Sequence, residues 1–379
     1  MKQFYPVAFF DHVMVLESTS AWHWLSFPPF NMLQNGAWAV SVFFVLSGYV
    51  LSLKLIQAET FTGRQMVWMS IGRYLRLALP VVASLLLVSA ILAIDGVKLM
   101  SMLSQNGEVM ANPYPGDLGL VGALEYGFIH SMLLGRSEFN PVLWTMLPEF
   151  YASLGIFILA PIIGCCRRER VGPLVYVCIY VALLALLAKT IFLGFLLGMA
   201  LCHLHQEPQI EKRLKEYAQY WVPAAWIIGV YLCGYMVRGL YEGAYAWITI
   251  GGFDRFDEYL YNAWGALFIL AAVLYSPRVQ RALQVPPVIA LGEISFSLYL
   301  THFVVLSSFG ATIYLHSPLQ NHSLSAAVSS CLSLLACLVV ATVFHRLINE
   351  PVVKISRNIS RLGQAVYQNK NEEVLQKAI

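Results

Sequence analysis

Two ionisable residues inside apolar segments have types that could support chemistry, His12 and Glu149. His12 lies about 12–15 Å along a segment that starts near Phe4, at about 1.5 Å per helical residue. Glu149 lies about 12 Å beyond Pro141 by the same rise, counted from the opposite side of a membrane. A buried histidine that a carboxylate orients can act as a general base toward a hydroxyl. The alternative is that both are satisfied core residues that hold helices together.

Two arginines, Arg73 and Arg76, are three residues apart in the stretch 70–80, so they lie on one face of a helix. We expect them to open the third apolar segment at the inner membrane surface. Forked guanidinium groups there suit a phosphorylated ligand from the cytoplasm. The alternative is ordinary anchoring to lipid headgroups.

Small and polar residues interrupt the apolar run 42–52, VFFVLSGYVLS, at Ser47, Gly48 and Tyr49. A membrane helix tolerates such residues where it packs closely on another helix or lines a polar cavity. We therefore expect this helix to face protein or a pocket. Pro148, one residue before Glu149, predicts a bend in the interior of its helix that makes room for a ligand.

A polar stripe runs through 292–302, GEISFSLYLTH, and includes Tyr299 and His302. It could line a passage across the membrane, which would make the protein a non-enzymatic transporter or flippase for a sugar- or lipid-linked substrate. The alternative is that its hydroxyl groups form contacts between helices.

The composition of the chain predicts an all-α, polytopic membrane protein that positions these residues on its helices. Of 379 residues, 58% are hydrophobic and 12% are charged, against about a quarter charged in soluble domains. Apolar stretches of spanning length predict ten helices. We place them at 4–20, 36–54, 77–94, 141–163, 172–188, 190–204, 220–237, 259–275, 286–309 and 324–347, and set aside 119–135 as weaker.

The basic residues support this count. With the N-terminus in the cytoplasm, 19 of the 24 Lys and Arg fall on the cytoplasmic side, as the positive-inside rule requires. We expect both termini in the cytoplasm, a membrane domain at 1–350 and a polar cytoplasmic tail at 351–379. In a bacterium, the plasma (inner) membrane is the expected location. The basic residues are dispersed along the sequence and do not indicate nucleic acid binding. We expect the lipid bilayer to surround the protein.

The seven cysteines lie mostly in apolar runs and form no CxxC pair, so we interpret them as small buried hydrophobes. His203 and His205, two residues apart, do not face one metal ion from a helix. We expect no metal cofactor.

Six motifs together resemble the acyltransferase-3 family of membrane O-acyltransferases, in that family's order across nearly the whole chain. They are His12 in the first helix, FFVLSGYVLS at 43–52, GRYLRL at 72–77, NPVLWTMLPEFY at 140–151, ISFSLYLTH at 294–302 and NEP at 349–351. The resemblance implies a ten-helix core that takes an acyl group, usually acetyl, from cytoplasmic acyl-CoA. It implies transfer to a hydroxyl of a carbohydrate or related acceptor.

The resemblance also implies roles for individual residues. His12 matches the family's essential histidine, a catalytic base or acyl relay, and Glu149 matches the acid after the tryptophan motif. Arg73 and Arg76 match an arginine pair suited to the phosphates of coenzyme A. Two further motif positions, Ser47 and Tyr49, are implied to contact the cofactor. Three others, Trp144, Tyr299 and His302, are implied to line the substrate site.

One position departs from the family pattern. The family commonly has arginine eleven residues before the histidine, where this chain has Met1, and Lys2 is the nearest cation. Either Lys2 substitutes for that arginine, or the sequence begins after part of its first helix.

The expected function is an acyl-CoA-dependent O-acyltransferase. A cytoplasmic arginine face paired with a mid-membrane histidine is what distinguishes it from the transporter, which has no specific need of that pair. A transporter also often has two related halves, and the sequence contains no convincing repeat.

Overall fold

The structure is a computed structural model that describes residues 28–58, 62–94, 96–98, 116, 118–168, 173–236, 245, 248, 255–318 and 322–362. Within these ranges every regular element is a helix, which confirms the all-α prediction. The segment 4–20, and His12 with it, lies outside the described residues.

The chain divides into two compact units. Among the described residues, unit 1 holds 63–150 and 286–362, and unit 2 holds 28–62 and 151–285. The boundary falls inside helix α7 (Met146–Arg168), between Phe150 and Tyr151. Each unit therefore combines segments that are far apart in the sequence.

In the part of the chain that the structure describes, five helices are long and apolar enough to cross a membrane. A sixth is added if α12 (Arg255–Leu274) and α13 (Pro277–Leu283), which meet at 95°, form one bent span. The same described ranges also contain four shorter apolar helices, Gly119–Leu134, Val175–Leu187, Leu193–Gln206 and Ala218–Cys233. The predicted count of ten spans and the cytoplasmic placement of both termini stay predictions.

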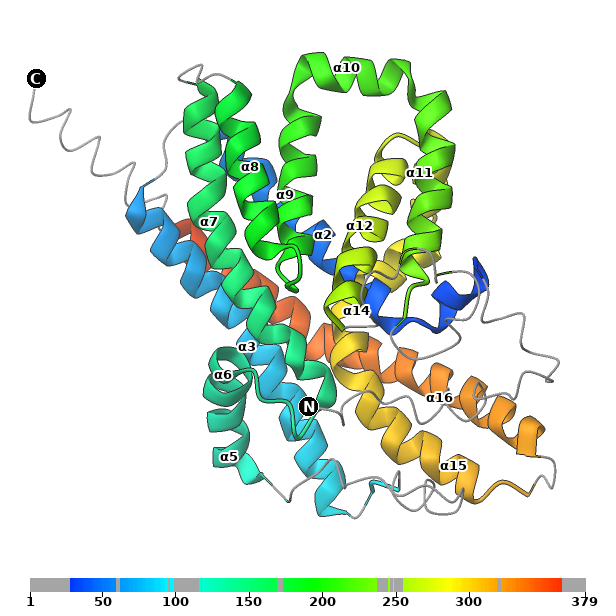
Figure 1. The fold of residues 1–379 in the computed structure, drawn as a ribbon. Coiled ribbons are helices and arrows are strands. Elements are labelled where there is room, and N and C mark those ends of the chain that lie inside the picture. The colour runs from blue at the N-terminus through cyan, green and yellow to red at the C-terminus, as the bar shows by residue number, and fades with distance from the viewer. Residues whose placement is uncertain are drawn as a thin grey trace, which may run out of the picture. The chain divides into compact units, whose positions relative to one another are not determined.

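Unit 1 is built around α3 (Gly63–Ala93), α14 (Pro286–Val305) and α16 (His322–Phe344). In Figure 1, α16 runs alongside α14 and its continuation α15 (Ala311–Leu315). The helix of α16 continues through the π-helical segment η6 (His345–Asn349) as far as Leu362. The remaining elements of unit 1 are α5 (Gly119–Glu125), η3 (Tyr126–Ser131), α6 (Met132–Leu134), η4 (Pro141–Thr145) and η5 (Leu306–Gly310).

Close backbone approach joins the first and last helical segments of unit 1. A side chain at Gly72 in α3 would place its Cβ 2.8 Å from the carbonyl oxygen of Ser356, so only glycine fits there. This contact explains the glycine of the GRYLRL stretch. It also shows that α3 is longer than predicted, because the helix begins at Gly63 and not near residue 77. Arg73 and Arg76 therefore lie within the helix and do not open it, which corrects our expectation.

Unit 2 contains η2 (Phe30–Gln34), α2 (Gly36–Gln57), most of α7, α8 (Pro173–Leu187), α9 (Leu193–Gln206), α10 (Pro208–Glu216) and α11 (Ala218–Cys233), followed by α12 and α13. Figure 1 shows α10 bridging the ends of α9 and α11. Helix α2 packs along α9, and α11 packs along α12.

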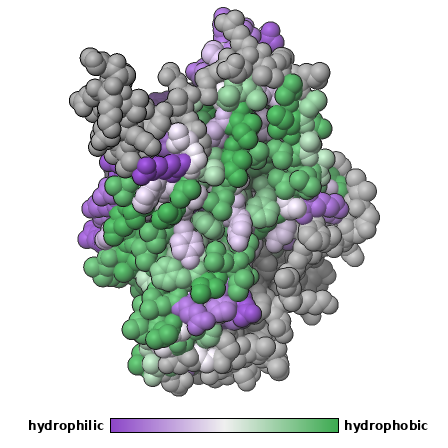
Figure 2. All heavy atoms as spheres, turned by 90° about the vertical axis from the view of Figure 1, so that its left-hand side faces the viewer, coloured by the Kyte–Doolittle hydropathy of each residue, from purple (hydrophilic) through white to green (hydrophobic). Residues whose placement is uncertain are grey.

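Large apolar side chains cover much of the described surface. Figure 2 shows them in green over most of one face, with hydrophilic residues in separate patches. On α8, Val177, Val181 and Leu186 are 55%, 57% and 73% exposed. Exposed apolar side chains on long apolar helices are what a lipid environment favours. The protein is therefore an integral membrane protein.

Candidate active site

Arg73 and Glu149 form an ion pair in unit 1, through Nη2 of the arginine and Oε1 of the acid. The Glu149 side chain is completely buried and that of Arg73 is 18% exposed. Breaking a buried ion pair on one side leaves an uncompensated charge, so each partner holds the other in place. The sequence had placed Glu149 beside His12, and this second contact stays a prediction because His12 lies outside the described residues.

The start of α7 fixes the position of Glu149. Residues Pro141–Thr145 form the 3₁₀ helix η4, and the α-helix begins at Met146. Pro148 is therefore the third residue of α7, where backbone N–H groups have no α-helical acceptor. The proline therefore lies in the first α-helical turn and not in the interior of the α-helix, which corrects its expected position, whereas the bend itself stays a prediction. An acid in this turn is also favoured by the helix dipole.

Arg76 lies one turn after Arg73 on the same face of α3, but its surroundings differ. Its Nη1 donates a hydrogen bond to Oδ1 of Asn349 at 2.7 Å. Its guanidinium carbon lies 5.1 Å from the centroid of the Phe296 ring. Among the described residues no carboxylate forms an ion pair with Arg76. Its positive charge is therefore solvated by an amide oxygen and an aromatic face.

Polar contacts between η4 and α14 surround the predicted substrate residue Tyr299. Its hydroxyl donates to the carbonyl oxygen of Val142 at 2.7 Å and lies 2.9 Å from Oγ1 of Thr145. Asn140 donates from Nδ2 to the Leu300 carbonyl oxygen at 2.9 Å and makes no side-chain cap to η4. These bonds fix the tryptophan motif to α14. Trp144, in the same 3₁₀ helix, is half-buried.

His302 follows Tyr299 by one helical turn in α14. Its Nδ1 lies 2.8 Å from the Tyr299 carbonyl oxygen and 3.1 Å from that of Leu298. Because carbonyl oxygens only accept hydrogen bonds, Nδ1 carries the proton in neutral His302 and Nε2 keeps a lone pair. His302 can therefore accept a proton or a hydrogen bond at Nε2.

The polar stripe of α14 does not form one continuous lining. Glu293 and Ser295 are exposed, whereas Ser297 and Thr301 are completely buried. Ser295 and Thr301 donate to carbonyl oxygens of their own helix, at 2.7 and 2.9 Å. The protons of hydroxyl groups bonded in this way are not available to a passing substrate. The arrangement gives the transporter alternative no support.

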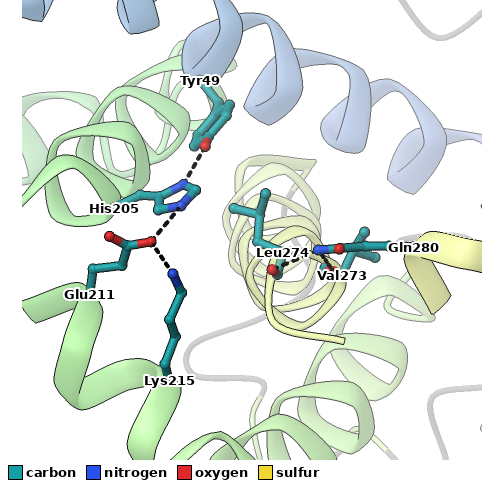
Figure 3. A network of polar contacts seen from close by, with 7 residues as sticks. All are labelled: Tyr49, His205, Glu211, Lys215, Val273, Leu274 and Gln280. Atoms are coloured by element: carbon teal, nitrogen blue, oxygen red, sulfur yellow. Dashed lines mark hydrogen bonds and ion pairs between the residues drawn. The ribbon is translucent and has the colours of Figure 1, made fainter. Parts of the chain in front are cut away.

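Tyr49 in unit 2 begins a chain of polar contacts that ends on α10 (Figure 3). Its hydroxyl bonds to Nδ1 of His205, in the last turn of α9. Nε2 of His205 lies 3.5 Å from Oε1 of Glu211, which also pairs with Nζ of Lys215 at 2.7 Å. The hydrogen bond from Lys215 lowers the pKa of Glu211 below its usual value.

The packing of α2 on α9 explains Gly48 in the FFVLSGY stretch. A Cβ at Gly48 would lie 2.8 Å from the carbonyl carbon of Phe195, and one at Gly198 would lie 2.7 Å from the backbone nitrogen of Tyr49. The helices approach each other closely at these glycines, as small residues allow in membrane proteins. The expectation that this helix faces protein is confirmed. Ser47, beside Gly48, is partly exposed.

The predicted site residues thus fall into separate groups. Unit 1 contains Arg73, Arg76, Glu149, Trp144, Tyr299 and His302, and unit 2 contains Ser47 and Tyr49. Within the described part of the chain, no three His, Cys, Asp or Glu residues are placed to hold a metal ion.

Sequence reasoning missed three participants in these contacts: Phe296 and Asn349 beside Arg76, and His205 beside Tyr49. Phe296 and Asn349 lie in the motifs ISFSLYLTH and NEP, and membership in these motifs is the only sequence signal that points to them. For His205 the sequence suggests only the role of a metal ligand, which its spacing from His203 argues against.

A family model described as an acyltransferase domain matches residues 9–345. Acyltransferase R4 of Phoma sp. (strain ATCC 20986 / MF5453) is 22% identical over 93% of this chain and 87% of its own length. Acyltransferase clz18 of Cochliobolus lunatus is 21% identical over 93% of this chain and 86% of its own. No solved structure matches the chain.

Proposed function

Because the chain belongs to the acyltransferase-3 family, and is therefore an acyltransferase of the membrane, we propose that its donor is a cytoplasmic acyl-CoA. The acyl group is acetyl in this proposal. The acceptor is a hydroxyl of a carbohydrate or related molecule. In a bacterial host, the enzyme would reside in the plasma (inner) membrane.

Arg76 is the observation that supports the donor assignment. It is a guanidinium held within unit 1 whose direct contacts, an amide oxygen and an aromatic ring, carry no negative charge. Glu149 also acts on Arg76 electrostatically, but that carboxylate is already paired with Arg73, so the group of two arginines and one acid keeps a positive charge. Such a group favours an anionic ligand, and coenzyme A carries phosphates that a forked guanidinium can bind. Arg73 contributes differently, because Glu149 already matches its charge.

His12 completes the proposed reaction. As the general base, it accepts the proton of the acceptor hydroxyl, whose oxygen attacks the thioester carbonyl carbon. The bond from that carbon to sulfur then breaks, and coenzyme A leaves as the thiolate, which takes up a proton. In the relay version, the acyl group rests on the His12 ring before the hydroxyl takes it. Ser47 and Tyr49 are assigned to the donor site by their motif alone, and Trp144, Tyr299 and His302 to the acceptor site.

The donor assignment is tested with purified protein, labelled acetyl-CoA and a panel of hydroxyl acceptors. Replacing Arg76 by Met should raise the KM for acetyl-CoA about tenfold or more, because a hydrogen bond to a charged group is worth about 1.5–3 kcal/mol. Arg64→Met is the matched control. Arg64 is exposed on the same helix and should tolerate the change.

Two results would contradict the assignment. One is equal KM values for the two variants when both are folded, as judged by size-exclusion chromatography. The other is wild-type protein that moves an acceptor across a vesicle membrane without consuming acetyl-CoA. That second result would favour the transporter.

A further inference from the structure

Asn349 holds a position where a carboxylate would be the ordinary partner of a half-buried arginine. Its side chain is 2% exposed and its Oδ1 accepts the hydrogen bond from Arg76. One turn earlier on α3, Arg73 has the ordinary arrangement, a carboxylate from Glu149. Arg73 is therefore held by a negatively charged partner, whereas Arg76 is held by a neutral one.

The orientation of the Asn349 amide follows from its neighbours. Arginine only donates hydrogen bonds, so the oxygen of the amide must face Arg76 and the nitrogen must face away. That nitrogen, Nδ2, lies 3.1 Å from Nδ1 of His345. Since Nδ2 donates, Nδ1 of His345 must carry the lone pair, and the neutral ring keeps its proton on Nε2.

Local backbone geometry supports this arrangement. His345 and Asn349 are the first and last residues of the π-helical segment η6, which interrupts the long helix between α16 and Leu362. Single π-helical turns occur frequently at functional sites because they redirect side chains. Phe296 of α14 covers the guanidinium with its ring. Two elements of unit 1, η6 and α14, thus contact one arginine of α3.

We propose that Asn349 is a positioning residue that fixes Arg76 while leaving its charge unmatched, so that Arg76 can bind a phosphate of the acyl donor. A neutral acceptor satisfies one N–H group of the guanidinium without supplying a counter-ion. An aspartate at this position would hold Arg76 at least as firmly, but it would neutralise the charge that attracts the ligand. His345 keeps the amide from turning its nitrogen toward Arg76. The inference rests on the proposed acyl-CoA function.

The test compares Asn349→Asp with wild type on two donors, acetyl-CoA and S-acetyl-pantetheine, a thioester that lacks phosphates. Asn349→Asp should raise the KM for acetyl-CoA about tenfold, since a lost charge-assisted contact is worth about 1.4 kcal/mol or more. Its kcat/KM for S-acetyl-pantetheine should match that of wild type. Asn358→Asp is the control, because it adds the same charge at an exposed position of the same helix. It should change neither donor's kinetics.

A second variant guards against a folding defect in Asn349→Asp. His345→Phe removes the acceptor of Nδ2 and adds no charge, so it should weaken acetyl-CoA binding by a smaller factor and leave the phosphate-free donor unaffected. Equal losses on both donors, in either variant, would overturn the positioning role of Asn349 alone. A wild-type protein that neither binds coenzyme A nor transfers from acetyl-CoA would overturn the proposed function, and this inference with it.

Discussion

Arg73 and Glu149 are 76 residues apart in the sequence and form an ion pair in which the acid is completely buried. The pair joins the interior of α3 to the first turn of α7. Burial makes both charges depend on each other, since removing one partner costs about 3–5 kcal/mol whereas replacing both by apolar residues is often neutral.

This relationship separates a structural role of Glu149 from a catalytic one. Glu149→Leu should lower the free energy of unfolding by about 3–5 kcal/mol, because it leaves Arg73 buried without its counter-charge. The double variant Arg73→Met/Glu149→Leu should recover most of that loss. Thermal unfolding in detergent measures both effects. If Glu149 acts in the reaction, the double variant is stable but inactive. Additive losses in the double variant would show that the two residues do not depend on each other.

The close packing of α2 and α9 makes a prediction about glycine. Gly48→Ala should destabilise unit 2, because its Cβ would lie 2.8 Å from the Phe195 carbonyl carbon and the helices would have to separate. Gly155→Ala in α7 is the matched control, since a Cβ there meets no atom within 4 Å. That variant should be neutral or more stable by up to about 1 kcal/mol from helix propensity. An unfolding temperature of Gly48→Ala equal to or above that of Gly155→Ala would contradict the close packing of α2 on α9.

The hydroxyl of Tyr49 supplies a third prediction. Tyr49→Phe removes its hydrogen bond to His205 and should cost about 1 kcal/mol of stability. Tyr180→Phe removes a buried hydroxyl that has no hydrogen-bond partner among the described residues, so it should cost nothing. Equal unfolding temperatures for the two variants would indicate that the Tyr49 contact contributes little.

The ion pair on α10 predicts a pH dependence of stability. Lys215 lowers the pKa of Glu211, so the stabilisation is fully present above the usual glutamate pKa and is lost as the pH falls through the lowered value. Wild type should unfold at a higher temperature than Glu211→Gln at neutral pH. The two should converge below about pH 4, the usual range for glutamate.

Glu216→Gln is the control for this titration. Glu216 lies at the C-terminal end of α10 and forms no ion pair within the described residues. Its unfolding temperature should follow that of wild type at every pH. A difference between wild type and Glu211→Gln that does not vary with pH would contradict the assignment.

Much of the fold could be predicted from apolar length alone. The expected helices at 36–54 and 286–309 correspond to Gly36–Gln57 and Pro286–Leu315, because long apolar runs have few alternatives to a helix. The start of α3 could not be found this way. Residues 63–76 contain three arginines and are less apolar, yet they are helical and pack against the segment 350–362 at Gly72. The segment 119–135, set aside as weaker, is also helical.

The site could be predicted only as a set of residue types. The three-residue spacing predicts that Arg73 and Arg76 share one face of a helix. It does not indicate that a carboxylate binds Arg73 and an amide binds Arg76. Contacts between residues 76 and 349 depend on how helices pack, and a local pattern does not contain that information. The role of Pro148 was missed for a similar reason, since the change from 3₁₀ to α-helix at Met146 leaves no signal in the sequence.

The most direct test of the account is the consumption of labelled acetyl-CoA by purified protein, with wild type and His12→Ala compared under the same conditions. We expect wild type to release coenzyme A and to label a hydroxyl acceptor, and His12→Ala to do neither while remaining folded. Equal consumption of acetyl-CoA by the two proteins would contradict it.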